Sequence, residues 1–170
     1  MHRKNPIILG LALAVSTVLG FAQEKETGRA ESARVATEHK IVAAAELKWE
    51  DGPASLPAGA QMVVLDGDPK KEGPFTIRLK MPAGYRIPPH THPAAAERIT
   101  VISGSVHLGI GTKIEEGTGR ELKAGDFAVI PAGVPHYARS AGEAVLQIHS
   151  EGPFQRDFVE PNSNPANAKR

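Results

Sequence analysis

Hydrophobic and polar residues alternate along much of the chain between residues 60 and 160, with the two-residue period of strands that are buried on one side. The clearest run covers residues 75–81, and its apolar face consists of Phe75, Ile77, Leu79 and Met81. Residues 97–103 alternate in the same way and place Glu97 on the same inward face as Ile99 and Val101. Both runs predict half-buried β-strands.

Further short runs predict strands at 41–49, 62–65, 106–110, 126–130, 134–140, 144–150 and 154–159. In the run at 106–110 we expect Val106, Leu108 and Ile110 to point inward and His107 to point outward. Glycines and prolines separate the runs roughly every ten residues, and no long helical period occurs. The pattern therefore predicts an all-β sandwich or barrel.

Composition narrows the class of protein. The 170 residues suit one domain, and 41% apolar with 23% charged residues is an ordinary globular balance. The formal net charge is +1 and no basic cluster stands out, so we expect no nucleic-acid partner. The chain has no cysteine, which excludes disulfides and thiolate metal ligands.

The N-terminal residues 1–22 have the features of a secretory signal peptide. Arg3 and Lys4 form a positive start, an apolar run from Ile7 to Leu19 follows, and Ala22 is the expected cleavage position. That run is shorter than the roughly 20 residues of a membrane span, so we expect no stable span after processing; an uncleaved anchor is the alternative. We expect a flexible tether at 23–40, the folded domain at 41–160, a disordered tail at 161–170 and a periplasmic or secreted location.

Chemistry concentrates in two stretches. In the first, His90 and His92 are two residues apart, so in an extended chain both imidazoles point to one side, and Glu97 follows closely. In the second, a turn shaped by proline and glycine ends at His136, which would supply a third nitrogen. Three imidazoles and a carboxylate suit a divalent transition metal, and they leave one or two positions open on a metal that prefers five or six ligands.

Spacing within these stretches resembles the two sequence motifs of the cupin family. The first motif is matched by Gly84, His90, His92, Glu97 and Gly104. The second is matched by Gly125, Pro131, Gly133 and His136. The last position of the second motif is Ser140 where the family has asparagine, which touches one peripheral position and not the metal ligands. The resemblance covers about residues 41–160.

This resemblance implies a single-domain jelly-roll β-barrel that binds one divalent transition metal through His90, His92, Glu97 and His136. It implies a metalloenzyme acting on a small organic molecule, with a dioxygenase of the quercetinase type as the leading example and isomerase or lyase chemistry next. Glu97 or a water on the metal would then handle protons. It also implies a homodimer. A non-catalytic binding or sensing protein, and a structural protein with a vestigial site, stay open as alternatives.

Copper, zinc, iron, manganese and nickel all suit such a ligand set. If the chain is exported unfolded, the site fills outside the cytoplasm, where the order of affinities favours Cu²⁺ and Zn²⁺.

Three further residues are candidates for contact with a small-molecule ligand. Tyr85 follows Gly84 at the expected lip of the site, where it would donate a hydrogen bond or only cover the barrel rim. Gln147 and His149 share one face of a predicted strand, and they would reach the ligand if that face looks into the barrel. The strand pattern alone leaves both phases open. Phosphate-binding, dinucleotide-binding and nucleophile-elbow motifs are absent from the sequence.

Overall fold

The computed structural model describes residues 39–115 and 117–167. The chain divides between Ile41 and Val42, and every described strand belongs to the second unit, Val42–Arg170. The expected signal peptide at 1–22 and nearly all of the expected tether at 23–40 lie outside the described residues. Within the described ranges, no helix combines the length and apolar character that crossing a membrane requires.

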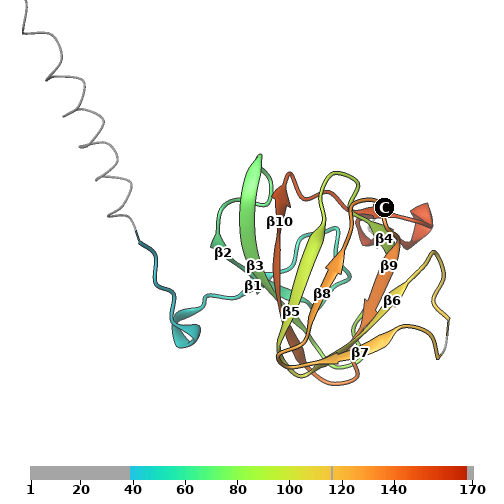
Figure 1. Ribbon diagram of the computed structural model, residues 1–170, viewed down its shortest axis with the longest axis horizontal. Coiled ribbons are helices and arrows are strands. Elements are labelled where there is room, and N and C mark those ends of the chain that lie inside the picture. Colours follow the sequence, from blue (N-terminus) through green and yellow to red (C-terminus); the bar gives the residue numbers. More distant parts are fainter. Residues whose placement is uncertain (1–38, 116, 168–170) are drawn as a thin grey trace, which may run out of the picture. The chain divides into compact units, whose positions relative to one another are not determined.

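Two antiparallel sheets build the second unit (Figure 1). The six-stranded sheet has the order β1 (Glu50–Asp51), β2 (Gln61–Asp66), β3 (Gly73–Met81), β10 (Ala144–Gly152), β5 (Glu97–Ser103) and β8 (Phe127–Ile130). The five-stranded sheet has the order β11 (Asp157–Phe158), β4 (Arg86–Thr91), β9 (His136–Arg139), β6 (Ser105–Ile110) and β7 (Arg120–Lys123). This arrangement confirms the predicted all-β jelly-roll fold.

The core lies between the sheets and follows the predicted alternation. On β3 the four inward residues are at most 4% exposed, while the intervening polar residues are half-buried on the outer face. On β5 the inward residues are Glu97, Ile99 and Val101, as predicted. One apolar cluster joins the inward residues of both sheets, so burying them holds the two layers together.

Two glycines, one between β5 and β6 and one within β6, occupy positions where a side chain would collide with neighbouring atoms. Gly104 joins β5 to β6 with a φ of +73°, and a side chain there would collide with the backbone of Glu143 and Ala144. Gly109 lies flat beneath the ring of Tyr137 on the neighbouring strand β9, and a Cβ atom at that position would overlap the ring. Glycine is therefore required there by packing rather than by backbone angle.

Several predicted elements differ from the structure. Residues 41–49 contain a 3-10 turn at Ala44–Glu46 in place of a strand, and β1 begins only at Glu50. Ile110 is 58% exposed, because it closes β6 at the rim beyond the covered part of the sheet. Of the run 154–159, only Asp157–Phe158 pairs as a strand. The expected tail contains two 3-10 turns, Pro161–Ser163 and Pro165–Asn167, within its described residues.

Candidate metal centre

Two of the predicted ligands are oriented by the same kind of local hydrogen bond. His90 and His136 each follow a proline, and the Nδ1 atom of each ring donates a hydrogen bond to the carbonyl oxygen two residues earlier, at 2.7 Å from His90 to Pro88 and 3.0 Å from His136 to Val134. The intervening proline fixes φ and restricts the residue before it, which holds that carbonyl in place. Each ring is thus oriented by the residues directly before it in the chain.

The third histidine is held from a distant part of the chain. His92 follows β4, and its Nδ1 donates to the carbonyl oxygen of Gln155 at 2.6 Å. Its own carbonyl oxygen accepts the amide of Gly133 at 2.9 Å, which ties the two sequence motifs together. His92 therefore takes its position only when the barrel and the segment after β10 have come together.

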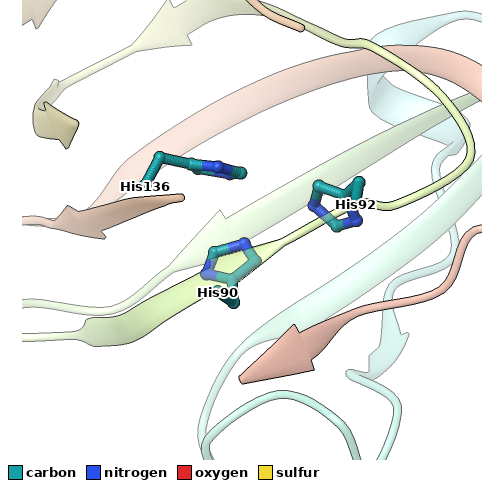
Figure 2. Close-up of side chains that lie close together, drawn as sticks. All are labelled: His90, His92 and His136. Atoms are coloured by element: carbon teal, nitrogen blue, oxygen red, sulfur yellow. The ribbon is translucent and has the colours of Figure 1, made fainter. Parts of the chain in front are cut away.

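The three rings converge on one point (Figure 2). His90 and His136 are direct partners across β4 and β9, and one nitrogen from each of His90, His92 and His136 lies within 4.8 Å of the other two. All three residues are at most 3% exposed. A backbone carbonyl only accepts hydrogen bonds, so each Nδ1 carries a hydrogen and the Nε2 atom of each ring is the one left to face the centre. Such bonds to the outer nitrogen are typical of metal-binding histidines.

Glu97 joins the group from β5 of the other sheet. Its Oε2 atom lies 3.0 Å from the Nε2 of His136 and 3.7 Å from the Nε2 of His92, and the residue is 5% exposed. A lone pair on nitrogen and a carboxylate oxygen this close attract only when a proton or a metal cation lies between them. The carboxylate thus adds negative charge where the histidine lone pairs meet.

Burial controls protonation in this group. Burial, followed by the positive charge of Arg156, lowers the pKa of His90 to about 2. Burial likewise lowers the pKa of His92 to about 4, although the charge of Glu97 acts in the opposite direction. For Glu97, burial alone would raise the pKa, but the contacts with His136 and His92 outweigh it and lower the pKa. At neutral pH these groups are therefore two neutral imidazoles and a carboxylate, the forms that bind metals.

The residues present fit a divalent transition metal. The Nε2 atom of His92 is buried and has no hydrogen-bond partner among the described residues. A buried polar atom without a partner is destabilising, and a cation at the centre of the group would remove that penalty. Neutral imidazole nitrogens with a carboxylate are the ligands that zinc, copper, iron, manganese and nickel accept.

The substrate-contact candidates lie in different environments. Tyr85 is buried in the apolar core, and its hydroxyl donates to the carbonyl oxygen of Pro57; burial raises the pKa of Tyr85 to about 12. Gln147 and His149 lie on the face of β10 opposite the buried Leu146 and Ile148. There Gln147 accepts from Arg78 at 3.0 Å, and His149 bonds with Thr76 at 3.0 Å. Of the two strand phases left open by the sequence, the structure has the one that faces out of the core.

A segment beyond β10 contributes contacts that the sequence analysis did not single out. The ring of Phe154 stacks on His92, Gln155 supplies the carbonyl that holds His92, and the charge of Arg156 acts on His90 and His92. The sequence carries a signal for this segment, because Phe154, Arg156 and Phe158 occupy alternate positions. In the structure all three are half-buried. An arginine between two aromatic residues at alternate positions is the pattern that marks this face.

Comparison with known proteins agrees with this arrangement. A family model of the cupin domain (Cupin_2) matches residues 77–150, which include all four predicted ligands. Germin-like protein 8-14 from Oryza sativa subsp. japonica is 40% identical over 84 residues, and germin-like protein subfamily 2 member 1 from Arabidopsis thaliana is 30% identical over 94 residues. These matches cover 48% and 55% of this chain but only 39% and 42% of the relatives.

Solved structures share the fold at low sequence identity. The polyketide cyclase RemF from Streptomyces resistomycificus aligns over 76% of this chain and 92% of its own, with a TM-score of 0.63 and 19% identity. KdgF from Halomonas sp. aligns over 66% of this chain and 94% of its own, with a TM-score of 0.53 and 20% identity. Residues 77–150 are thus similar to the cupin domain, about half of the chain is similar to germin-like proteins, and the solved structures share its fold.

Proposed function

We propose that this protein is an exported, metal-dependent cupin enzyme that acts on a small organic molecule, by dioxygenase chemistry of the quercetinase type or by isomerisation or elimination. One observation carries the proposal: three buried histidines give their outer nitrogens to backbone carbonyls and turn the inner ones toward one point beside Glu97. On a metal that takes five or six ligands, this set would leave one or two positions for a substrate atom, unlike a closed structural site.

The four residues of the candidate metal centre would have different roles. His90, His92 and His136 would hold the metal, and Glu97 would complete the set or, if it stays free, accept a proton from the substrate. When bound, a divalent transition metal would supply Lewis acidity that polarises a substrate oxygen. The low exposure of all four side chains excludes bulk water and strengthens their electrostatic effect on the substrate.

The proposal is tested with purified protein loaded separately with Mn²⁺, Fe²⁺, Ni²⁺, Cu²⁺ and Zn²⁺. We expect one metal per chain by elemental analysis, and turnover of a phenolic or enolic compound, followed by oxygen uptake and by mass spectrometry of the products. His136→Ala should abolish both, whereas His107→Ala on the outer face of β6 should change neither. Loaded protein that turns over no compound in such a panel would contradict an enzymatic role.

A non-catalytic binding protein is the second candidate. It is favoured by the shortage of acids and bases, because Glu97 is the one carboxylate among the described residues that lies within ion-pair distance of the histidines. In that case a small molecule should bind in a one-to-one complex and be recovered unchanged by mass spectrometry.

Export and dimerisation complete the proposal. Export is supported by the sequence of residues 1–22, and fractionation of the source cells with N-terminal sequencing of the mature protein tests it.

A homodimer is supported by the apolar edge strand β8, where Phe127 and Val129 are 57% and 48% exposed. Light scattering coupled to size-exclusion chromatography should give twice the chain mass, and Phe127→Lys should lower it.

A further inference from the structure

We infer that Arg156 and the cavity beside it bind the carboxylate of a small, largely apolar organic acid, and that such an acid is the substrate class of this protein. The binding site is argued from the cavity itself. The assignment of the acid as substrate rests in addition on the proposed function of the metal centre.

The cavity has a volume of about 220 Å³ and opens between the 53–56 loop and the six-stranded sheet. Most of its wall is apolar and is formed by Leu56, Met62, Ile77, Leu79, Ile148 and Phe154. Pockets for drug-sized ligands measure roughly 300–1,000 Å³, so this cavity suits a smaller molecule. Its walls favour an occupant with a compact hydrocarbon body.

Arg156 supplies the polar end of the cavity, and its charge lacks a partner. No carboxylate in the described part of the chain lies within ion-pair distance of the guanidinium group. The Nε atom is buried and has no hydrogen-bond partner among the same residues. One terminal nitrogen reaches Ser55, but both contacts are long at 3.4 Å. The charge is thus partly withdrawn from water without a carboxylate in contact, since Glu97 acts on it only from beyond ion-pair distance, and an anion in the cavity would supply that contact.

The shape of the Arg156 guanidinium group indicates which kind of anion fits the cavity. The guanidinium group is a planar fork of N–H donors that matches the two oxygens of a carboxylate. Lys70 is the other cation in the wall, and it is an exposed residue. A single half-buried positive charge in a mostly apolar wall favours a monoanion over a doubly charged phosphate, whose second charge would lack a partner in the cavity.

The cavity shares a wall with the metal centre. Phe154 lines the cavity and stacks on His92, with ring centroids 4.0 Å apart. Two residues further on, Arg156 lines the same cavity, and the intervening Gln155 holds His92 through its carbonyl oxygen. Three consecutive residues thus connect the wall of the cavity to one of the predicted metal ligands.

Calorimetric titration of the metal-free protein tests the site. The probes are benzoate and isobutyrate, each paired with its neutral primary amide, together with inorganic phosphate. We expect each carboxylate to bind roughly 10- to 100-fold more tightly than its amide, because a charge-assisted bond to the guanidinium is lost in the amide. Equal affinity for acid and amide, no binding of either acid, or tighter binding of phosphate would overturn the inference.

Variants then locate the effect. Arg156→Gln should remove the preference for acid over amide, whereas Arg120→Gln on the edge strand β7 should preserve it. Circular dichroism and the melting temperature establish that each variant is folded. If Arg156→Gln does not fold, Arg156→Lys keeps the charge without the fork, and it should reduce the preference. An unchanged preference in a folded Arg156 variant would refute the assignment.

A separate measurement addresses the link to the metal. In Co²⁺-loaded protein, benzoate should shift the visible absorption of the metal, and Arg156→Gln should abolish that shift at the same benzoate concentration. If benzoate binds the metal-free protein but leaves the Co²⁺ spectrum unchanged, the cavity is a carboxylate site and the acid is not the substrate. If Co²⁺ does not bind at all, the proposed function fails, while the titrations still decide the carboxylate site.

Discussion

The ring of Phe154 lies flat against the imidazole of His92, with centroids 4.0 Å apart and planes inclined by 13°. Phe154 also meets Phe75 of the core edge to face, with centroids 5.0 Å apart. The segment after β10 therefore joins the hydrophobic core to a predicted metal ligand. Because stacked rings gain energy only in defined geometries, this contact limits how far His92 can turn.

Replacing Phe154 with leucine should weaken metal binding without removing a ligand. Leucine keeps apolar volume but cannot stack, so His92 gains rotational freedom, and we expect the metal dissociation constant to rise about 10-fold. Competition titration with a chelator of known affinity measures it. Phe127→Leu changes an exposed phenylalanine on β8 and should leave the constant unaltered. Equal constants in the two variants would show that the stacking does not position His92.

Removing any one of the three histidines should abolish stoichiometric metal binding. His90→Ala, His92→Ala and His136→Ala each leave two imidazoles, and we expect metal content after desalting to fall from about one per chain to near zero. Elemental analysis measures the content. His107→Ala, on the outer face of β6, is the matched control. Full metal content in a folded His136→Ala protein would refute the centre.

Glu97→Gln tests whether the carboxylate charge contributes to metal binding. The substitution keeps size and removes the negative charge that lies 3.0 Å from His136 and 3.7 Å from His92. We expect the dissociation constant for Zn²⁺ to rise by about 10- to 100-fold. Calorimetric titration of Zn²⁺ measures it. An unchanged constant would mean that Glu97 acts only on the substrate.

The metal-free protein should lose stability as the pH falls below neutrality. The pKa of His90 is lowered from 6.5 to about 2 and that of His92 to about 4, so the unfolded chain binds more protons than the folded one between about pH 6.5 and 4. Each histidine then removes up to roughly 1.4 kcal/mol of unfolding free energy per pH unit. Glu97 acts in the same direction at lower pH, since its pKa is also lowered.

Urea unfolding of the metal-free protein at pH 7.5, 6.5, 5.5 and 4.5 checks this dependence. The unfolding free energy should be constant above pH 6.5 and should fall steadily below it. His90→Ala, if folded, should reduce the slope. A free energy that stays flat from pH 7.5 to 4.5 would contradict the buried, neutral state assigned to these histidines.

Gly109→Ala should destabilise the fold through a single steric contact. A Cβ atom at this position would overlap the ring of Tyr137, which is 1% exposed and cannot move away freely. We expect a loss of about 1–3 kcal/mol in urea unfolding. Gly142→Ala is the matched control, because a Cβ atom there meets nothing within 4 Å. Combining Gly109→Ala with Tyr137→Leu should recover part of the loss.

Periodicity predicted the strands that bury one face completely. The runs at 75–81 and 97–103 have the inward residues expected of them, because a two-residue alternation leaves a single way to cover an apolar face. The predicted ligands His90, His92 and His136 also come together as the motif spacing indicated. Local spacing sufficed for His90 and His136, because each is oriented by the residues directly before it.

Features that depend on distant partners could not be predicted in this way. The phase of Gln147 and His149 is set by the pairing of β10 with β3 and β5, which sequence alternation alone does not reveal. Ile110 has the right parity for the core but lies at the rim, where nothing covers it. The partner of His92 is a backbone carbonyl, which every residue possesses, so no side-chain type identified Gln155.

The pairing of His90 with His136 across β4 and β9 has a mechanical consequence. A cation bound to both rings would fasten the two strands to each other in the interior of the five-stranded sheet, where β9 also pairs with β6. Opening that sheet would then require the cation to leave first. Amide hydrogens of β9 should accordingly exchange with deuterium far more slowly in loaded protein than in stripped protein, while those of the outlying strand β1 should exchange alike in both.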